Sequence, residues 1–158
     1  MRKQLVWTAM PLIAVGALFA ATGAAAVAPD SESYSTKLTG AAEVPGPGDP
    51  DGTGDFAAIA TKRTLCYVLA AGRVEPISAS HIHAGASDVA GPVAITLKSA
   101  TRKGVSDCIT AVPDAEDTGV TMSESELAAI KSDPTGFYVN VHNAAYPGGA
   151  VRGQLVAG

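Results

Sequence analysis

Short runs of alternating apolar and polar residues, separated by clusters of turn-forming residues, are the feature of this sequence that most restricts its fold. Because successive side chains of a strand point to opposite faces, such alternation is typical of strands with one buried face. The longest interruption is Pro45 to Asp55, which is rich in Pro, Gly and Asp, and we expect neither strand nor helix to run through it. The spacing of runs and turns predicts an all-β, antiparallel sandwich or barrel. The expected strands are residues 34–40, 56–61, 65–71, 79–83, 92–97, 105–112, 137–142 and 150–156.

One short helix interrupts this pattern before the penultimate strand. Ser123 is able to cap the first turn and Glu126, three residues later, to bond back to it, which forms a capping box ahead of the apolar residues 127–130. Pro134 and Gly136 then end the helix. We expect this helix to cover one end of the sandwich.

The first 26 residues have the pattern of a secretory signal peptide. Arg2 and Lys3 precede an almost wholly apolar stretch, residues 5–21, and small residues follow it. We therefore expect residues 27–33 to form a flexible lead-in and residues 34–158 to form a single domain. The mature protein is expected to be secreted or otherwise extracytoplasmic, in the periplasm or outside the cell, with no membrane span.

The charge of the mature chain argues against nucleic acid as a partner. Removing Arg2 and Lys3 leaves nine basic residues against 15 acidic ones, a net charge of about −6. Such a surface repels phosphate, and no basic run offsets it. The remaining partner classes are an unknown extracellular partner or a metal ion.

The two cysteines, Cys66 and Cys108, are expected to form a disulfide. An even number of cysteines in an exported protein favours one bridge, because thiols tend to be oxidised outside the cytoplasm. Two alternatives remain open at this point: two separate buried thiols, or a redox pair.

All three histidines of the chain lie in two of the expected strands. His81 and His83 are two residues apart, so they share one face of their strand. By the same rule Tyr138, Asn140 and His142 share a face. If the two strands are neighbours, three imidazoles converge, and they form a candidate site for copper or zinc with Asn140 and Tyr138 beside the ligands.

Two other interpretations of the histidines stay open: a hydrogen-bonded structural cluster, and a catalytic or binding role without metal. Glu43, Asp88 and Tyr146 are candidates for a fourth ligand or for a group that supports the ligands. Imidazole nitrogens within about 4 Å of a common point would support a metal site, since metal–nitrogen bonds are about 2 Å long.

Three groups of residues, in order along the chain, carry a resemblance to a known family. They are residues 38–45, residues 80–85 with 91–93, and residues 137–142 with 147–155. In these segments the chain resembles the CHRD domain, a module found in chordin and in many exported bacterial proteins. The resemblance implies an immunoglobulin-like β-sandwich that acts as a binding or structural module, with no established catalytic activity. The family's cysteine positions match Cys66 and Cys108, which supports the bridge.

The two residues that depart from the family pattern are Asp88, where a glycine is frequent, and Asn143, where threonine is frequent. Both residues tolerate tight turns, so the fold implied by the resemblance stands, although a site could be altered.

The pair His81 and His83 with the later His142 also resembles part of the copper site of copper/zinc superoxide dismutases. Their zinc-binding loop, with further histidines, has no counterpart in this sequence. A metal-dependent redox enzyme is therefore the second hypothesis, behind the binding or structural module. A third hypothesis is an extracellular protein–protein module in which the histidines are purely structural.

Overall fold

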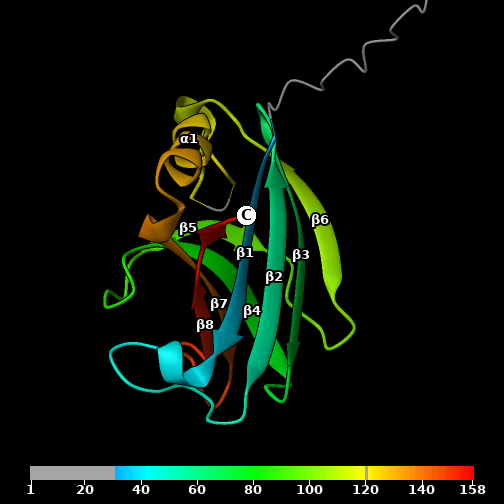
Figure 1. Ribbon diagram of the computed structural model, residues 1–158, viewed down its shortest axis with the longest axis vertical. Coiled ribbons are helices and arrows are strands. Elements are labelled where there is room, and N and C mark those ends of the chain that lie inside the picture. The colour runs from blue at the N-terminus through cyan, green and yellow to red at the C-terminus, as the bar shows by residue number, and fades with distance from the viewer. Residues whose placement is uncertain (1–30, 120) are drawn as a thin grey trace, which may run out of the picture.

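The computed structural model describes residues 31–119 and 121–158, and the expected signal peptide lies outside them. Within the described residues the all-β class is confirmed: strands dominate, and the single α-helix is short (Figure 1). The strands are β1 (Glu32–Thr39), β2 (Thr53–Ala60), β3 (Thr64–Gly72), β4 (Ile77–Ala84), β5 (Val93–Leu97), β6 (Val105–Thr110), β7 (Phe137–Asn143), β8 (Val151–Gln154) and β9 (Val156–Ala157); the helix is α1 (Glu124–Ser132).

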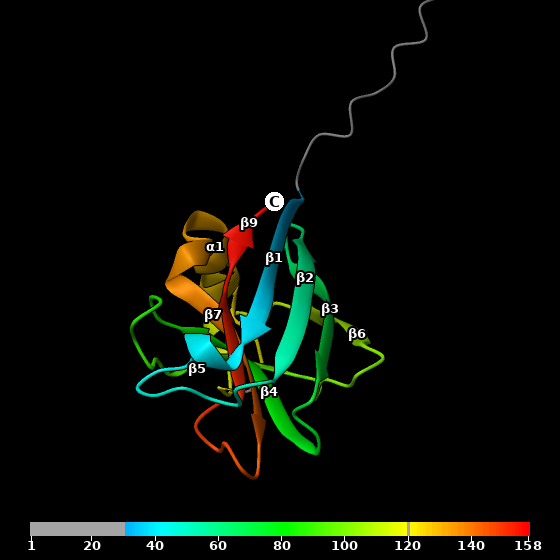
Figure 2. The same cartoon turned by 60° about the horizontal axis from the view of Figure 1, so that its bottom comes forward.

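The strands form one antiparallel sheet that curls around its own core (Figures 1 and 2). Their order is β5-β4-β7-β8-β1-β2-β3-β6, with β9 paired to β1. The strand ladder that joins the two halves of the sheet, β5-β4-β7-β8 and β1-β2-β3-β6, is short, because β1 and β8 share a single residue pair, Thr39 with Arg152. The short strand β9 extends this ladder by pairing Val156 with Ser35. An immunoglobulin-like sandwich has two separate sheets, whereas hydrogen bonding here continues from one half to the other. The immunoglobulin-like arrangement therefore stays a prediction.

Apolar side chains from both halves of the curled sheet form the core between them. In β2 every second residue is buried, as the sequence pattern predicts for a strand with one covered face. In the other half, β7 is buried on both faces apart from the half-buried His142, and its core-facing residues belong to the same core cluster. Core residues from the two halves include Phe56, Ala58, Leu65, Tyr67, Leu69, Ile82, Ile95, Val139 and Val141.

Several element boundaries differ from the sequence prediction by one to three residues. Strand β1 starts at Glu32, inside the expected lead-in. Residues 53–55, expected in a turn, belong to β2 because Gly54 and Asp55 pair with Leu38 and Lys37 of β1. The last expected strand, residues 150–156, is divided into β8 and β9 around Leu155, so the helix precedes the third strand from the end. Pairing with neighbouring strands decides these ends, which local turn chemistry cannot do.

The predicted capping box of α1 is confirmed. The Ser123 hydroxyl accepts from the Glu126 amide at 3.1 Å, and the Glu126 carboxylate accepts from the Ser123 amide at 2.8 Å. Leu127 and Ile130 are buried, so this narrow apolar face fixes the helix to the core. Figure 1 shows α1 beside one end of the curled sheet.

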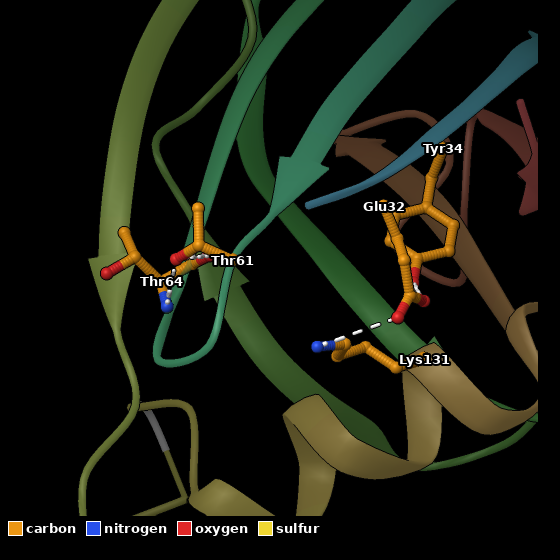
Figure 3. A network of polar contacts seen from close by, with 5 residues as sticks. All are labelled: Glu32, Tyr34, Thr61, Thr64 and Lys131. Atoms are coloured by element: carbon orange, nitrogen blue, oxygen red, sulfur yellow. Dashed lines mark hydrogen bonds and ion pairs between the residues drawn. The ribbon is translucent and has the colours of Figure 1, made fainter. Parts of the chain in front are cut away.

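A polar contact ties α1 to the first strand (Figure 3). Lys131 of α1 lies 3.6 Å from a carboxylate oxygen of Glu32, whose other oxygen accepts from the Tyr34 hydroxyl at 2.6 Å. In the same view the Thr61 hydroxyl accepts from the Thr64 amide at 3.2 Å and closes the turn between β2 and β3. The helix is thus held at the start of β1.

The expected disulfide is present. Cys66 of β3 and Cys108 of β6 are direct cross-strand partners and are bonded to each other. No helix among the described residues is long and apolar enough to cross a membrane.

Candidate functional site

The two histidine-bearing strands, β4 and β7, are neighbours in the sheet. Their register places His81 opposite Asn140, His83 opposite Tyr138, and His142 opposite Ala79. Ile82, between the two histidines of β4, points into the core and is fully buried. The histidines therefore lie on the face of the sheet that is turned away from the core.

The three imidazoles converge on one point. The Nδ1 atom of His81 lies 3.1 Å from the Nε2 atom of His142. One ring nitrogen from each of His81, His83 and His142 lies within 4.8 Å of the other two. Three atoms so placed are within about 3 Å of a common point, near the metal–nitrogen bond length of about 2 Å. The three imidazole nitrogens therefore lie within the distance of about 4 Å from a common point that supports a metal site.

Backbone carbonyls fix which nitrogens of two of these rings carry a proton. The Nδ1 atom of His83 bonds to the Gly91 carbonyl at 3.0 Å, and that of His142 bonds to the Pro147 carbonyl at 3.0 Å. Because a carbonyl only accepts, both Nδ1 atoms are protonated and both Nε2 atoms keep a lone pair. His142 Nε2 therefore accepts from His81 Nδ1. The Nε2 atom of His83 is buried and has no hydrogen-bond partner among the described residues.

The surroundings of the cluster favour neutral imidazoles. Burial lowers the pKa of His81 to about 4, and the neighbouring His142 and His83 add to this shift. Burial also lowers the pKa of His83 and of His142, although the bonds to Gly91 and Pro147 oppose the effect. At neutral pH all three rings are uncharged, which is the form that binds a metal ion.

Asn140 and Tyr138 lie beside the histidines, on the face of β7 where the sequence places them. The Asn140 amide nitrogen donates to a Glu43 carboxylate oxygen at 2.7 Å. Its oxygen is buried and, like His83 Nε2, has no partner among the described residues. Burial raises the pKa of Glu43 to about 7, and the charge of Arg152 opposes that shift. Two acceptor atoms thus lie buried and unbonded on this face of the sheet.

None of the three candidates for a fourth ligand joins the histidine group. Asp88 is exposed on the loop after β4. Glu43 and Tyr146 line a small cleft of about 250 Å³ beside Pro147, the residue that holds His142. Within residues 31–119 and 121–158, the group of three metal-ligating side chains consists of histidines alone.

Sequence reasoning missed Arg152 and Gly91, two residues that shape the site. Arg152 is only 2% exposed although it stands in a strand where alternation gives no sign of a buried charge. A side chain at Gly91 would collide with the Ala84 carbonyl oxygen, so only glycine fits there. The signal that was available is the position of Arg152 between two apolar or small neighbours, Val151 and Gly153.

A larger hollow than the cleft beside Pro147, about 770 Å³, lies elsewhere on the described residues. It is an open, mostly apolar surface over β1, β2, β3 and β6, lined by side chains that include Ala57, Ile59 and Val68 and by the disulfide. It contains no histidine. This hollow therefore offers none of the imidazole ligands of the candidate site.

Comparison with known proteins identifies one family. The family model described as the CHRD domain matches residues 34–155, which include the three histidines and both cysteines. No curated protein and no solved structure matches the chain.

Proposed function

The chain belongs to the CHRD domain family, and from this premise we propose that it is an exported binding or structural module that holds one copper or zinc ion at His81, His83 and His142. The membership supports the module, and the histidine geometry supports the metal. The immunoglobulin-like arrangement that the family resemblance implies is part of the proposal, as is a single domain over residues 34–158.

The observation that carries the metal proposal is the unbonded Nε2 atom of His83. A buried nitrogen with a lone pair and no hydrogen bond costs free energy, which a metal ion would recover. The Nδ1–H groups of His83 and His142 bond to carbonyls, as metal-bound histidines usually do, because this bond orients the ring and strengthens the ligand.

The contact between His81 and His142 is also compatible with a shared ion. Two nitrogens bound tetrahedrally to one ion are about 3.3 Å apart, close to the 3.1 Å between His81 Nδ1 and His142 Nε2. The ion would take the place of the proton between them, and that single proton of His81 would move from Nδ1 to Nε2. Such a site needs no net loss of protons at neutral pH.

Metal analysis tests this proposal. The protein is purified from the periplasm or the medium without a polyhistidine tag, and its metal-free form is titrated with Cu²⁺ and with Zn²⁺ in a calorimeter. We expect one equivalent of at least one of these ions to bind, with Mg²⁺ as the control ion showing no heat. Binding at a hundredfold excess over Kd would stabilise the fold by about 2.7 kcal/mol.

Matched variants locate the ion. His81→Ala, His83→Ala and His142→Ala should each lose binding. Thr96→Ala should keep it, because Thr96 is exposed and faces His81 from β5 without offering a nitrogen ligand. If neither ion binds the wild type, or if the histidine variants bind as the wild type does, the metal proposal is wrong. The histidines would then be structural, and the same variants should lower the melting temperature only.

No observation on the described residues favours the redox-enzyme hypothesis over the binding module. An assay of superoxide dismutation by the metal-loaded protein separates the two, and we expect no activity above that of the free ion.

A further inference from the structure

Arg152 is a buried cation that donates to Gln154 of its own strand at 3.4 Å and more closely to two carbonyls of a loop. It is 2% exposed, and no carboxylate among the described residues forms a salt bridge with it. Its guanidinium donates to the Ala86 carbonyl at 2.7 Å and to the Val89 carbonyl at 3.0 Å. A buried charge is costly unless it is well bonded, so this arrangement needs a reason.

The same guanidinium lies on an aromatic stack that ends at a histidine. Its central carbon is 3.4 Å from the centre of the Tyr138 ring. The other partner of Tyr138 is His83, whose ring is nearly parallel, at 8°, with centres 4.8 Å apart. Arg152, Tyr138 and His83 thus form a stack from β8 across β7 to β4, in the order in which these strands pair.

Gly91 joins the stack to the loop. The Tyr138 hydroxyl accepts from the Gly91 amide at 3.1 Å and donates to the Gly91 carbonyl at 3.4 Å, and the same carbonyl accepts from His83 Nδ1 at 3.0 Å. The Gly91 carbonyl decides which nitrogen of His83 is protonated. Tyr138 holds Gly91 directly through its hydroxyl, and Arg152 holds the same loop through two hydrogen bonds.

We propose that Arg152 and Tyr138 are positioning residues that hold the loop 85–91 on His83, keep that ring protonated at Nδ1, and so present its Nε2 lone pair to the other two histidines. The role of the lone pair rests on the proposed function, because a copper or zinc ion would bind to it. The tautomer of His83 is a property of the metal-free protein and is testable without any metal.

Nitrogen NMR of the metal-free protein tests the tautomer. Long-range proton–nitrogen correlation on histidine-labelled protein shows, for each ring, which nitrogen carries the proton. We expect His83 of the wild type to be protonated at Nδ1. Tyr138→Phe keeps the ring of the stack but removes the hydroxyl, so both of its bonds that hold Gly91 beside His83 are lost. With the Gly91 carbonyl no longer held in place, the share of the Nε2-protonated form of His83 should rise.

Metal affinity gives the second measurement. Loss of a group that orients a metal-bound histidine weakens binding roughly 10- to 100-fold, and we expect Tyr138→Phe to weaken Cu²⁺ or Zn²⁺ binding by that factor. Arg152→Lys keeps the charge but loses the planar fork that reaches two carbonyls, and it should act in the same direction. Circular dichroism checks that both variants are folded; if Arg152→Lys is not, Tyr138→Phe alone decides.

Tyr67→Phe is the matched control. Tyr67 and Tyr138 are both 3% exposed, and the Tyr67 hydroxyl also accepts from one backbone amide, that of Lys98 at 2.8 Å, but it contacts no histidine. This variant should leave tautomer and affinity unchanged. Wild-type His83 protonated at Nε2, or a Tyr138→Phe variant that matches Tyr67→Phe in both measurements, overturns the inference. If no metal binds the wild type, the proposed function fails. The tautomer spectra still decide whether Arg152 and Tyr138 keep His83 protonated at Nδ1.

Discussion

At the scale of single residues, the fold buries a carboxyl group and a guanidinium on the histidine-bearing face. Glu43 is 6% exposed and Arg152 is 2% exposed. Their charges interact without a direct salt bridge: Arg152 opposes the rise in the pKa of Glu43, but burial dominates and raises that pKa to about 7. The neighbouring histidines of β4 and β7 are neutral at this pH and add no charge. Ionisation of Glu43 therefore costs the folded protein free energy near neutral pH.

This burial predicts how stability depends on pH in the metal-free protein. The folded carboxyl of Glu43 keeps its proton up to a pKa of about 7, whereas the ordinary value is 4.5. The folded state thus binds more protons than the unfolded state between these values, so this group lowers stability as pH rises from 4.5 to 7. Glu43→Gln removes the charge but can still accept from Asn140, and it should be about 1–3 kcal/mol more stable than the wild type at pH 8, with no difference at pH 4.5.

Urea unfolding at pH 4.5, 6 and 8 measures this difference. Glu116→Gln, at an exposed position, is the control and should match the wild type at each pH. Equal stability of Glu43→Gln and the wild type at pH 8 would show that burial of Glu43 does not make its ionisation costly in the folded protein.

At the scale of secondary-structure elements, the register of β4 against β7 creates the site. A slip by one residue would turn His81 and His83 into the core and Ile82 outward, which the apolar core forbids. The helix α1 lies outside this strand pair and is stabilised at its own end. Its capping box therefore affects the stability of the helix without touching the histidines.

We expect Ser123→Ala to lower the free energy of unfolding by about 1 kcal/mol, because the Glu126 amide loses its side-chain acceptor at the first turn of α1. Ser132→Ala, at the exposed last residue of the same helix, should be close to neutral. Thermal unfolding of both variants gives the comparison. A Ser123→Ala variant as stable as Ser132→Ala would mean that the cap contributes nothing.

The sequence predicts elements better than it predicts their contacts. Period-two alternation places every main strand and puts His81 and His83 on one face, because side-chain direction follows from local geometry alone. That β4 pairs with β7 depends on the whole sheet. The carbonyls of Gly91 and Pro147 that fix two tautomers are backbone groups, so no residue type announces them. Arg152 was missed because an arginine in an alternating strand normally faces solvent.

Asn143 shows how a departure from the family pattern is accommodated. Its side chain donates to the Val74 carbonyl at 2.7 Å and accepts from the Tyr146 amide at 2.7 Å. The residue is buried, and both ends of its amide are bonded. The asparagine thus fixes the turn between β7 and β8 that also carries Pro147, the partner of His142.

At the scale of the whole molecule, the disulfide and the histidine cluster lie in different halves of the sheet. Cys66 and Cys108 join β3 to β6 at one edge, whereas β4 and β7 lie near the other edge, beyond β8, β1 and β2. Among the strands that the structure describes, β6 pairs with β3 alone, so the bridge secures an edge strand. Stability supplied by the bridge and ligand binding at the histidines should therefore be separable properties.

Replacing both cysteines by alanine tests this separation. The bridge joins residues 42 positions apart, and its loss should lower the free energy of unfolding by about 2–4 kcal/mol, since the unfolded chain gains the freedom of an open loop. Urea unfolding with and without a thiol reductant gives an internal control: the wild type should fall to the level of the alanine variant, and the variant should not respond. Its affinity for Cu²⁺ or Zn²⁺, measured where it is folded, should equal that of the wild type. A folded variant with weakened metal binding would instead show that the two halves of the sheet are coupled through the short ladder at Thr39 and Arg152. Arg152 would then be the first residue to examine, because it also bonds to the loop beside His83.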